Sequence, residues 1–278
     1  MSKDLLDVNR DRTGPDRFQE VSRQARTGWG RRSAELVAVL AAVLFCAHYV
    51  GLLDAGRMLD GVSDVADLLA EMWPPDFGNV GNWWGPLWDS LAMSVAATAL
   101  AVVLSLPLAL LAASTTSPHP LVYGVARLVL NTLRAVPELI MAIVLVAAVG
   151  FGALPGALAL GIHSAGMVGK FYAEAIEHAD KAPIEAARAA GASSAQVILH
   201  GVMPQVLPQM ADVTIYRWEY NFRASVVVGV VGAGGIGFEL IAALRTLNCD
   251  EVSAILILIL ATVTVVDGFG GLLRKRFG

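Results

Sequence analysis

The sequence is poor in charged residues and in cysteine. Only 16% of its 278 residues are Asp, Glu, Lys or Arg and 56% are hydrophobic, which excludes an intrinsically disordered chain. The two cysteines, Cys46 and Cys249, are too few for a disulfide framework or a thiolate metal site. A mean hydropathy of +0.61 and several long apolar runs instead indicate an all-α polytopic membrane protein.

Six segments are predicted to cross the membrane. The apolar run over 121–169 is too long for one crossing, and the glycine-rich stretch at 150–156 divides it into two. A further span carries Asp212, Arg217, Glu219 and Arg223, so its charges must face a protein interior or a wet cavity. The expected spans are 34–53, 90–113, 124–149, 154–176, 208–231 and 252–272.

Basic residues orient these spans. Eight Lys or Arg lie in residues 1–33 and three close the chain at 274–276, so the positive-inside rule places both termini in the cytoplasm. Residues 1–33 are therefore expected to form a loosely folded polar cytoplasmic tail, before a transmembrane domain over 34–278. The acidic segment 54–89 is expected outside, with a short amphipathic helix near Leu59 and Trp73, Trp83, Trp84 and Trp88 in the outer interfacial belt.

A glycine run offers a different interpretation. Residues 232–237 match the pattern G-x-G-x-x-G of dinucleotide-binding proteins, and Asp250 follows. That site needs parallel strands and crossover helices, whereas an apolar span comes next. We therefore expect a flexible, closely packed connection between two spans, in which glycine permits positive φ and close backbone approach.

The cytoplasmic segment between the fourth and fifth spans, residues 178–204, carries the most specific motif. The run E-A-A-R-A-A-G over 185–191, followed by Pro204, resembles the E-A-A-x-x-x-G coupling loop of ABC importer permeases. Gly201 and Met203 depart from the Ile and Leu of that motif. Small side chains would let a short helix enter a groove on a partner, with charged residues at its rim. The resemblance implies that an ATPase contacts Glu185, Ala186, Ala187, Arg188, Gly191 and Pro204.

Longer runs resemble the phosphonate-type branch of these permeases. They are L-R-A-V-P-E-L over 133–139, A-L-G-I-H-S-A-G over 159–166, Y-A-E-A-I-E over 172–177 and R-W-E-Y-N-F-R-A-S over 217–225. The resemblance implies a type I, MetI-like permease fold in the bacterial cytoplasmic membrane. It also implies a homodimer that binds two ATPase subunits inside and receives substrate from a solute-binding protein outside, surrounded by lipid and without nucleic acid.

The sequence contains no G-x-x-x-x-G-K-[ST] phosphate loop. The chain is therefore expected to hold no cofactor and not to be an enzyme, with ATP and Mg²⁺ bound by the partner ATPase. No cluster of metal ligands is recognised in the sequence.

Charges inside the predicted spans are candidates for the substrate path. Arg134 and Glu138 are four residues apart with Pro137 as a kink between them, and Glu219 and Arg223 repeat the spacing. Each pair could neutralise itself on one helix face, or its arginine could face a cavity and stabilise an oxyanion. Arg134, Glu138, Glu219, Asn221 and Arg223 are the candidate pathway residues.

The leading hypothesis is the permease subunit of an ATP-driven importer for phosphonate, phosphite or phosphate. The sequence does not distinguish among these three substrates. An importer of another small solute such as methionine is an alternative. A secondary transporter with His163, Glu138 or Glu219 as proton sites is a further one, although a packing role suits His163 better.

Overall fold

The protein is helical, without strands, in the part that this computed structural model describes, which is the backbone of residues 15–277 and the side chains of residues 32–276. The chain divides into two compact units, with the boundary after Leu69. The first unit begins with α2 (Pro15–Tyr49). The second half of the predicted tail is therefore helical and not loosely folded, whereas residues 1–14 lie outside the described part.

The amphipathic helix expected in segment 54–89 is α3 (Ala55–Glu71). Asp54 caps it, because its Oδ1 accepts hydrogen bonds from the amides of Gly56 at 3.1 Å and Arg57 at 3.2 Å. None of its residues is buried, and Leu59 and Val62 expose their side chains.

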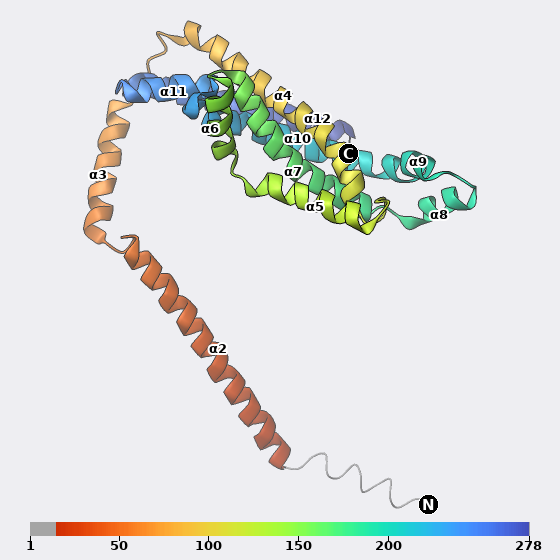
Figure 1. The fold of residues 1–278 in the computed structure, drawn as a ribbon. Coiled ribbons are helices and arrows are strands. Elements are labelled where there is room, and N and C mark those ends of the chain that lie inside the picture. The colour runs from red at the N-terminus through yellow and green to blue at the C-terminus, as the bar shows by residue number, and fades with distance from the viewer. Residues whose placement is uncertain (1–14, 278) are drawn as a thin grey trace, which may run out of the picture. The chain divides into compact units, whose positions relative to one another are not determined.

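The second unit is a bundle of long helices linked by short ones, drawn from yellow to blue in Figure 1. Figure 1 shows α8 and α9 projecting from the end of the bundle at which α12 finishes, with α6 and α11 at the opposite end. The elements are α4 (Val80–Ala112), α5 (Pro120–Ala135), α6 (Glu138–Val149), α7 (Ala153–Glu177), α8 (Lys181–Ala189), α9 (Ser194–Gln196), the π-helix η1 (Val197–Val202), α10 (Met203–Val228), the π-helix η2 (Gly229–Ala233), α11 (Ile236–Arg245) and α12 (Cys249–Phe277).

Helix α7 is the centre of this bundle and contacts α4, α5, α6 and α10. Its small residues allow that position. A methyl group placed on Gly161 would lie 2.7 Å from the side chain of Leu100 on α4, and one on Gly169 would lie 2.5 Å from Leu130 on α5. Close helix packing through small residues, rather than a polar site, explains these glycines.

The kink expected at Pro137 is a full break in the third predicted span. Helices α5 and α6 meet at 84°, and Val136 between them is extended, with φ −84° and ψ 119°. Proline disfavours helical geometry in the residue before it, which ends α5 at Ala135. Arg134 and Glu138 consequently belong to different helices.

By length and composition, three described helical segments could cross a membrane, namely Arg32–Tyr49, Val80–Ala112 and Cys249–Arg276. The bent pairs α5 with α6 and Ser194–Ala233 with α11 raise the number to as many as five. Helix α7, which coincides with the predicted span 154–176, does not meet these criteria. A count of six spans stays a prediction.

The glycine run lies in the connection that follows α10. Gly232, Gly234 and Gly235 have φ of 99°, 75° and 72°, the left-handed region that favours glycine. A methyl group on Gly237 would collide with the carbonyl oxygen of Val226. The expected positive φ and close approach are confirmed. The sequence did not predict that α11 occupies most of the connection.

The expectation that all four tryptophans face the interface is wrong for Trp83. This side chain is 1% exposed and packs in a core cluster with Phe222 and Ile255, whereas Trp84 and Trp88 are 62% and 71% exposed. Trp83 and Trp84 are neighbours and point about 100° apart around α4, whereas Trp88 lies one turn after Trp84 on the same face. The bundle therefore buries the face that carries Trp83 and leaves the face of Trp84 and Trp88 exposed.

Candidate functional site: the coupling segment and a buried polar network

Residues 178–204, the coupling segment, fold as local signals in the sequence dictate. Asp180 caps α8 by accepting a hydrogen bond from the amide of Ala182 at 3.0 Å. Gly191, with φ of 82°, ends the helix in the left-handed conformation. Ser193 and Gln196 then form a capping box for α9, and Pro204 lies in the first turn of α10.

Helix α8 has two unlike faces. Ile184 is buried in a cluster with Val197 and Val202 of η1, and this contact holds α8 against the following π-helix. Gly201, one of the two departures from the family motif, lies at this contact, because a methyl group on it would be 3.5 Å from Cα of Ile184. Lys181, Glu185, Ala186 and Arg188 are exposed and Ala187 is half-buried.

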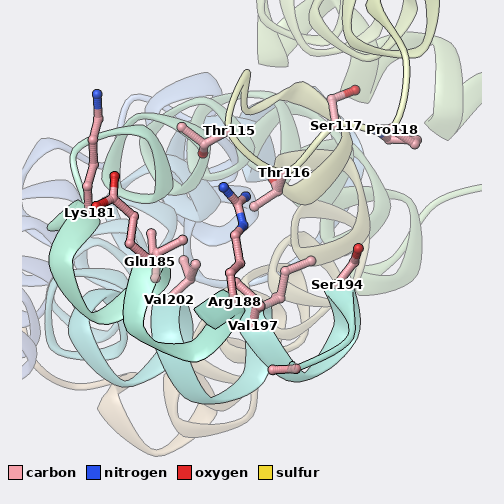
Figure 2. A pocket seen from close by; sticks show the side chains of 13 residues that line it. Thr115, Thr116, Ser117, Pro118, Lys181, Glu185, Arg188, Ser194, Val197 and Val202 are labelled. Carbon is pink, nitrogen blue, oxygen red and sulfur yellow. The ribbon is translucent and has the colours of Figure 1, made fainter. Parts of the chain in front are cut away.

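The charged residues of α8 border a cavity of about 580 Å³ (Figure 2). Its other wall is the loop between α4 and α5, with Thr115, Thr116 and Ser117. In Figure 2 the Arg188 side chain extends toward Thr116. The cavity therefore joins the coupling segment to a second loop at the same end of the bundle.

One ion pair ties this end of the bundle together. Nη2 of Arg127 donates to both carboxylate oxygens of Glu177 at 2.9 Å, and its Nε donates to the carbonyl oxygen of Ala112 at 3.0 Å. The amide of Ser114 donates to Glu177 at 2.7 Å. Burial by itself raises the pKa of Glu177, but the hydrogen bonds from Ser114 and the charge of Arg127 outweigh it and lower that pKa. Helices α4, α5 and α7 are thereby joined directly before the coupling segment.

A second set of polar residues, the polar network, lies inside the bundle where α4, α6, α7 and α10 meet. Nδ2 of Asn221 donates to Thr98 at 2.9 Å, and the Ser164 hydroxyl donates to Oδ1 of Asn221 at 2.8 Å. Asn221 and Ser164 are fully buried. The members are Thr98, Glu138, His163, Ser164, Arg217, Tyr220 and Asn221.

Arg217 and Glu138 are the opposite charges of the polar network. Arg217 is 5% exposed, its Nε donates to the Ser164 hydroxyl at 2.8 Å, and its guanidinium carbon lies 4.1 Å from the centre of the Tyr220 ring. The Tyr220 hydroxyl donates to Oε1 of Glu138 at 3.0 Å. Oε2 of Glu138 is 3.9 Å from Nη2 of Arg217 and 3.8 Å from Nε2 of His163, so both ion pairs are loose.

The other predicted pathway residues lie elsewhere. Glu219 pairs with Arg274 of α12 at 2.9 Å, and Arg223 pairs with Asp267 of α12 at 2.7 Å. Of the two alternatives for this pair, neutralisation of Glu219 by Arg223 on one helix face is not observed, because both pair across to α12. Arg134, in the last turn of α5, has a buried Nη1 without a hydrogen-bond partner among the described residues. Of the five candidates, only Glu138 and Asn221 join the polar network.

Sequence reasoning missed Arg217 as a site residue. In the sequence this arginine is one of four charges of the fifth predicted span, yet Arg217, Tyr220 and Asn221 stand at i, i+3 and i+4 on one face of a helix. That periodicity was the available signal. Thr98 and Ser164 gave none, because single hydroxyl residues in apolar helices are common.

The chemistry available in the polar network is that of anion contact and hydrogen bonding. Within the described residues, no group of three or more His, Cys, Asp or Glu side chains is placed to hold a metal ion. Arginine is suited to phosphorus oxyanions, because its planar fork of donors matches their oxygens.

Known proteins resemble this chain in both sequence and fold. The phosphite transport system permease protein PtxC of Stutzerimonas stutzeri is 63% identical over 250 residues, which are 90% of this chain and 91% of that one. The phosphate-import permease protein PhnE of Mycolicibacterium smegmatis is 43% identical over 210 residues, covering 76% of this chain and 40% of that one. A structure of the MetNI methionine ABC transporter in inward facing conformations matches with a TM-score of 0.63 and 21% identity, over 73% of this chain and 99% of that one.

The family described as "Binding-protein-dependent transport system inner membrane component" matches residues 105–278. The match covers the coupling segment and every member of the polar network except Thr98. It confirms the permease fold, the multi-pass location in the inner membrane and the family that the resemblance at Glu185 to Pro204 indicated. The chain belongs to this family of inner membrane transport components, which are not enzymes.

Proposed function

We propose that this chain is the membrane-spanning subunit of an ATP-driven importer that carries phosphite or a closely related phosphorus oxyanion. The observation that supports the substrate class most is the 63% identity to a phosphite permease over nine-tenths of both chains. The buried arginine of the polar network agrees with it, because a guanidinium inside a bundle suits an anionic cargo.

In this proposal the coupling segment is the contact with an ATPase. Its exposed face carries Glu185 and Arg188 beside the small residues Ala186 and Ala187, so a short helix can enter a groove of the partner. Gly191 ends α8 within the segment, and Pro204 lies at the start of α10, where the segment finishes. The partner ATPase binds ATP and Mg²⁺, and this chain holds no cofactor of its own.

The assembly we propose contains two copies of this chain, two ATPase subunits and an extracytoplasmic solute-binding protein. The coupling segment then faces the cytoplasm, and residues 54–89 with α3 face the binding protein. The pathway roles of Arg134, Glu138, Glu219, Asn221 and Arg223 are part of the proposal, and among them Glu138 and Asn221 have the strongest structural support.

The test is transport by the purified assembly. The tagged chain is isolated from its native host, the ATPase and binding protein that accompany it are identified, and the complex is reconstituted into liposomes. Phosphite uptake should require ATP, the ATPase and the binding protein. Uptake that is independent of ATP and follows a proton gradient instead would refute the importer assignment. ATP-driven uptake of methionine but not of phosphite would refute the substrate class.

A further inference from the structure

The loose ion pair at the centre of the polar network is unusual for buried charges. Buried Arg and Glu side chains ordinarily form short, often bidentate hydrogen bonds, because an unpaired buried charge is costly. Here Nη2 of Arg217 and Oε2 of Glu138 are 3.9 Å apart, and neither atom has a hydrogen-bond partner among the described residues. One donor and one acceptor are therefore left unfilled, facing each other.

The Arg217 guanidinium is held at its Nε and on one face. Ser164 holds its Nε, and the face of the guanidinium lies on the Tyr220 ring. Ser164 is in turn held by Asn221, which Thr98 anchors to α4. The side chain is thus positioned through its Nε and its face, while its buried Nη2 has no hydrogen-bond partner among the described residues. A donor held in place in this way is preorganised for contact with an anion.

Glu138 also has other partners within reach. Its Oε1 accepts a hydrogen bond from Tyr220, and Nε2 of His163 is 3.8 Å from its Oε2. Glu138 begins α6, directly after the break at Pro137, so its carboxylate is attached where the backbone changes direction. If the Glu138 carboxylate moves away from Arg217, Tyr220 and His163 are still there to pair with it, so it does not become an unpaired buried charge.

We propose that Arg217 is the anion-contacting side chain of the transport path, and that Glu138 is the counter-charge which a phosphorus oxyanion displaces and which then expels it. This inference rests on the proposed function. The oxyanion inserts its oxygens at the unfilled Nη2 of Arg217 while Glu138 turns toward His163. Return of the carboxylate competes for the same guanidinium, which keeps the affinity low enough for release.

The experiment compares neutralised variants in the reconstituted complex, with the initial rate of phosphite uptake measured per folded protein. Arg217→Gln should lower uptake by about tenfold or more, because the contact to a charged group is lost. Glu138→Gln should lower both the KM and the maximal rate, since the anion is held without its competitor. Arg217→Lys keeps the charge but loses the fork, and it should raise the KM.

The double variant Arg217→Gln with Glu138→Gln separates a contact from a structural ion pair. It carries no buried charge at this position, so a purely structural pair predicts that uptake returns, whereas we expect uptake to stay as low as in Arg217→Gln. The control neutralises the partly exposed pair Lys170 and Glu174 of α7 in the same way, and its uptake per folded protein should be that of the wild type.

Recovery of uptake in the double variant would overturn the inference, as would a raised KM in Glu138→Gln. Both results leave ATP-driven phosphite transport by the wild type intact, so they are distinct from failure of the proposed function. Absence of phosphite uptake by the wild-type complex would overturn the proposed function and this inference together.

Discussion

The coupling segment and the polar network are built in opposite ways. The helix ends and turns of the coupling segment are set by neighbours in the chain, through the Asp180 cap, the left-handed Gly191 and the Ser193 capping box, and its charged face is exposed. The polar network joins residues 57 and 123 positions apart and is buried. A substitution on an exposed surface can remove function without lowering stability, whereas a substitution in a buried network changes both.

The largest effect is expected from charge reversal on the exposed surface. Glu185→Lys should reduce ATP-driven uptake by about tenfold or more, because it places a like charge beside Arg188 and any acid-binding groove of the ATPase repels it. Membrane insertion and the thermal midpoint of the purified chain should stay unchanged. Co-purification measures whether the ATPase still binds, and uptake in liposomes measures whether transport is still driven.

A control for Glu185→Lys is Glu239→Lys, the same change on α11 at the opposite end of the bundle (Figure 1). It should leave ATPase binding intact. Equal loss of binding in both variants would show that added positive charge, rather than the coupling segment, is responsible.

Removal of the central amide should have the next largest effect, on stability. Asn221→Leu removes the acceptor of the Ser164 hydroxyl and the donor to the Thr98 hydroxyl, and the loss of these two hydrogen bonds costs about 1–2 kcal/mol in a membrane bundle. Thermal unfolding in detergent should shift to lower temperature, and uptake should fall with it. Ser225→Ala is the control, since that hydroxyl donates only to the Phe222 carbonyl within its own helix. If Asn221→Leu unfolds at the same temperature as Ser225→Ala, the hydrogen bonds of the polar network do not stabilise the bundle.

Strain at the end of α8 should have a smaller effect that is confined to coupling. Gly191→Val forces a β-branched residue into φ of 82°, at a cost of about 1–3 kcal/mol, so the turn after α8 rearranges. Uptake should fall several-fold while the bundle melts as in the wild type. Gly124→Ala is the matched control, because no atom lies within 4 Å of the added methyl group. A lower melting temperature for Gly191→Val alone would place this turn in the folding core.

The smallest effect concerns pH. The folded-state pKa of Glu177 is lowered, so its pair with Arg127 stabilises the fold above the ordinary carboxyl pKa, and that stability is lost as the pH falls through the lowered value. The pair is partly exposed, so the contribution is at most about 1 kcal/mol. Unfolding measured from neutral to acidic pH should show this loss in the wild type and a smaller one in Glu177→Gln.

Local physics determined much of this protein from sequence alone. Apolar runs long enough for a bilayer set the helices near 34–53, 90–113 and 252–272, because a chain in lipid must satisfy its backbone within each helix. Pro137 set the break before α6, and the glycine run set a connection with positive φ. These signals lie within a few residues of the structure they specify.

Only the tertiary structure decided which charges meet. Glu219 and Arg223 stand four residues apart, yet they pair with Arg274 and Asp267 of α12, at separations of 55 and 44 residues. Arg217 became the centre of the polar network because α7 and α4 pack closely enough, through small residues, to bring Ser164 and Thr98 to α10. Such pairings depend on how whole helices register against one another, and no local pattern records that register.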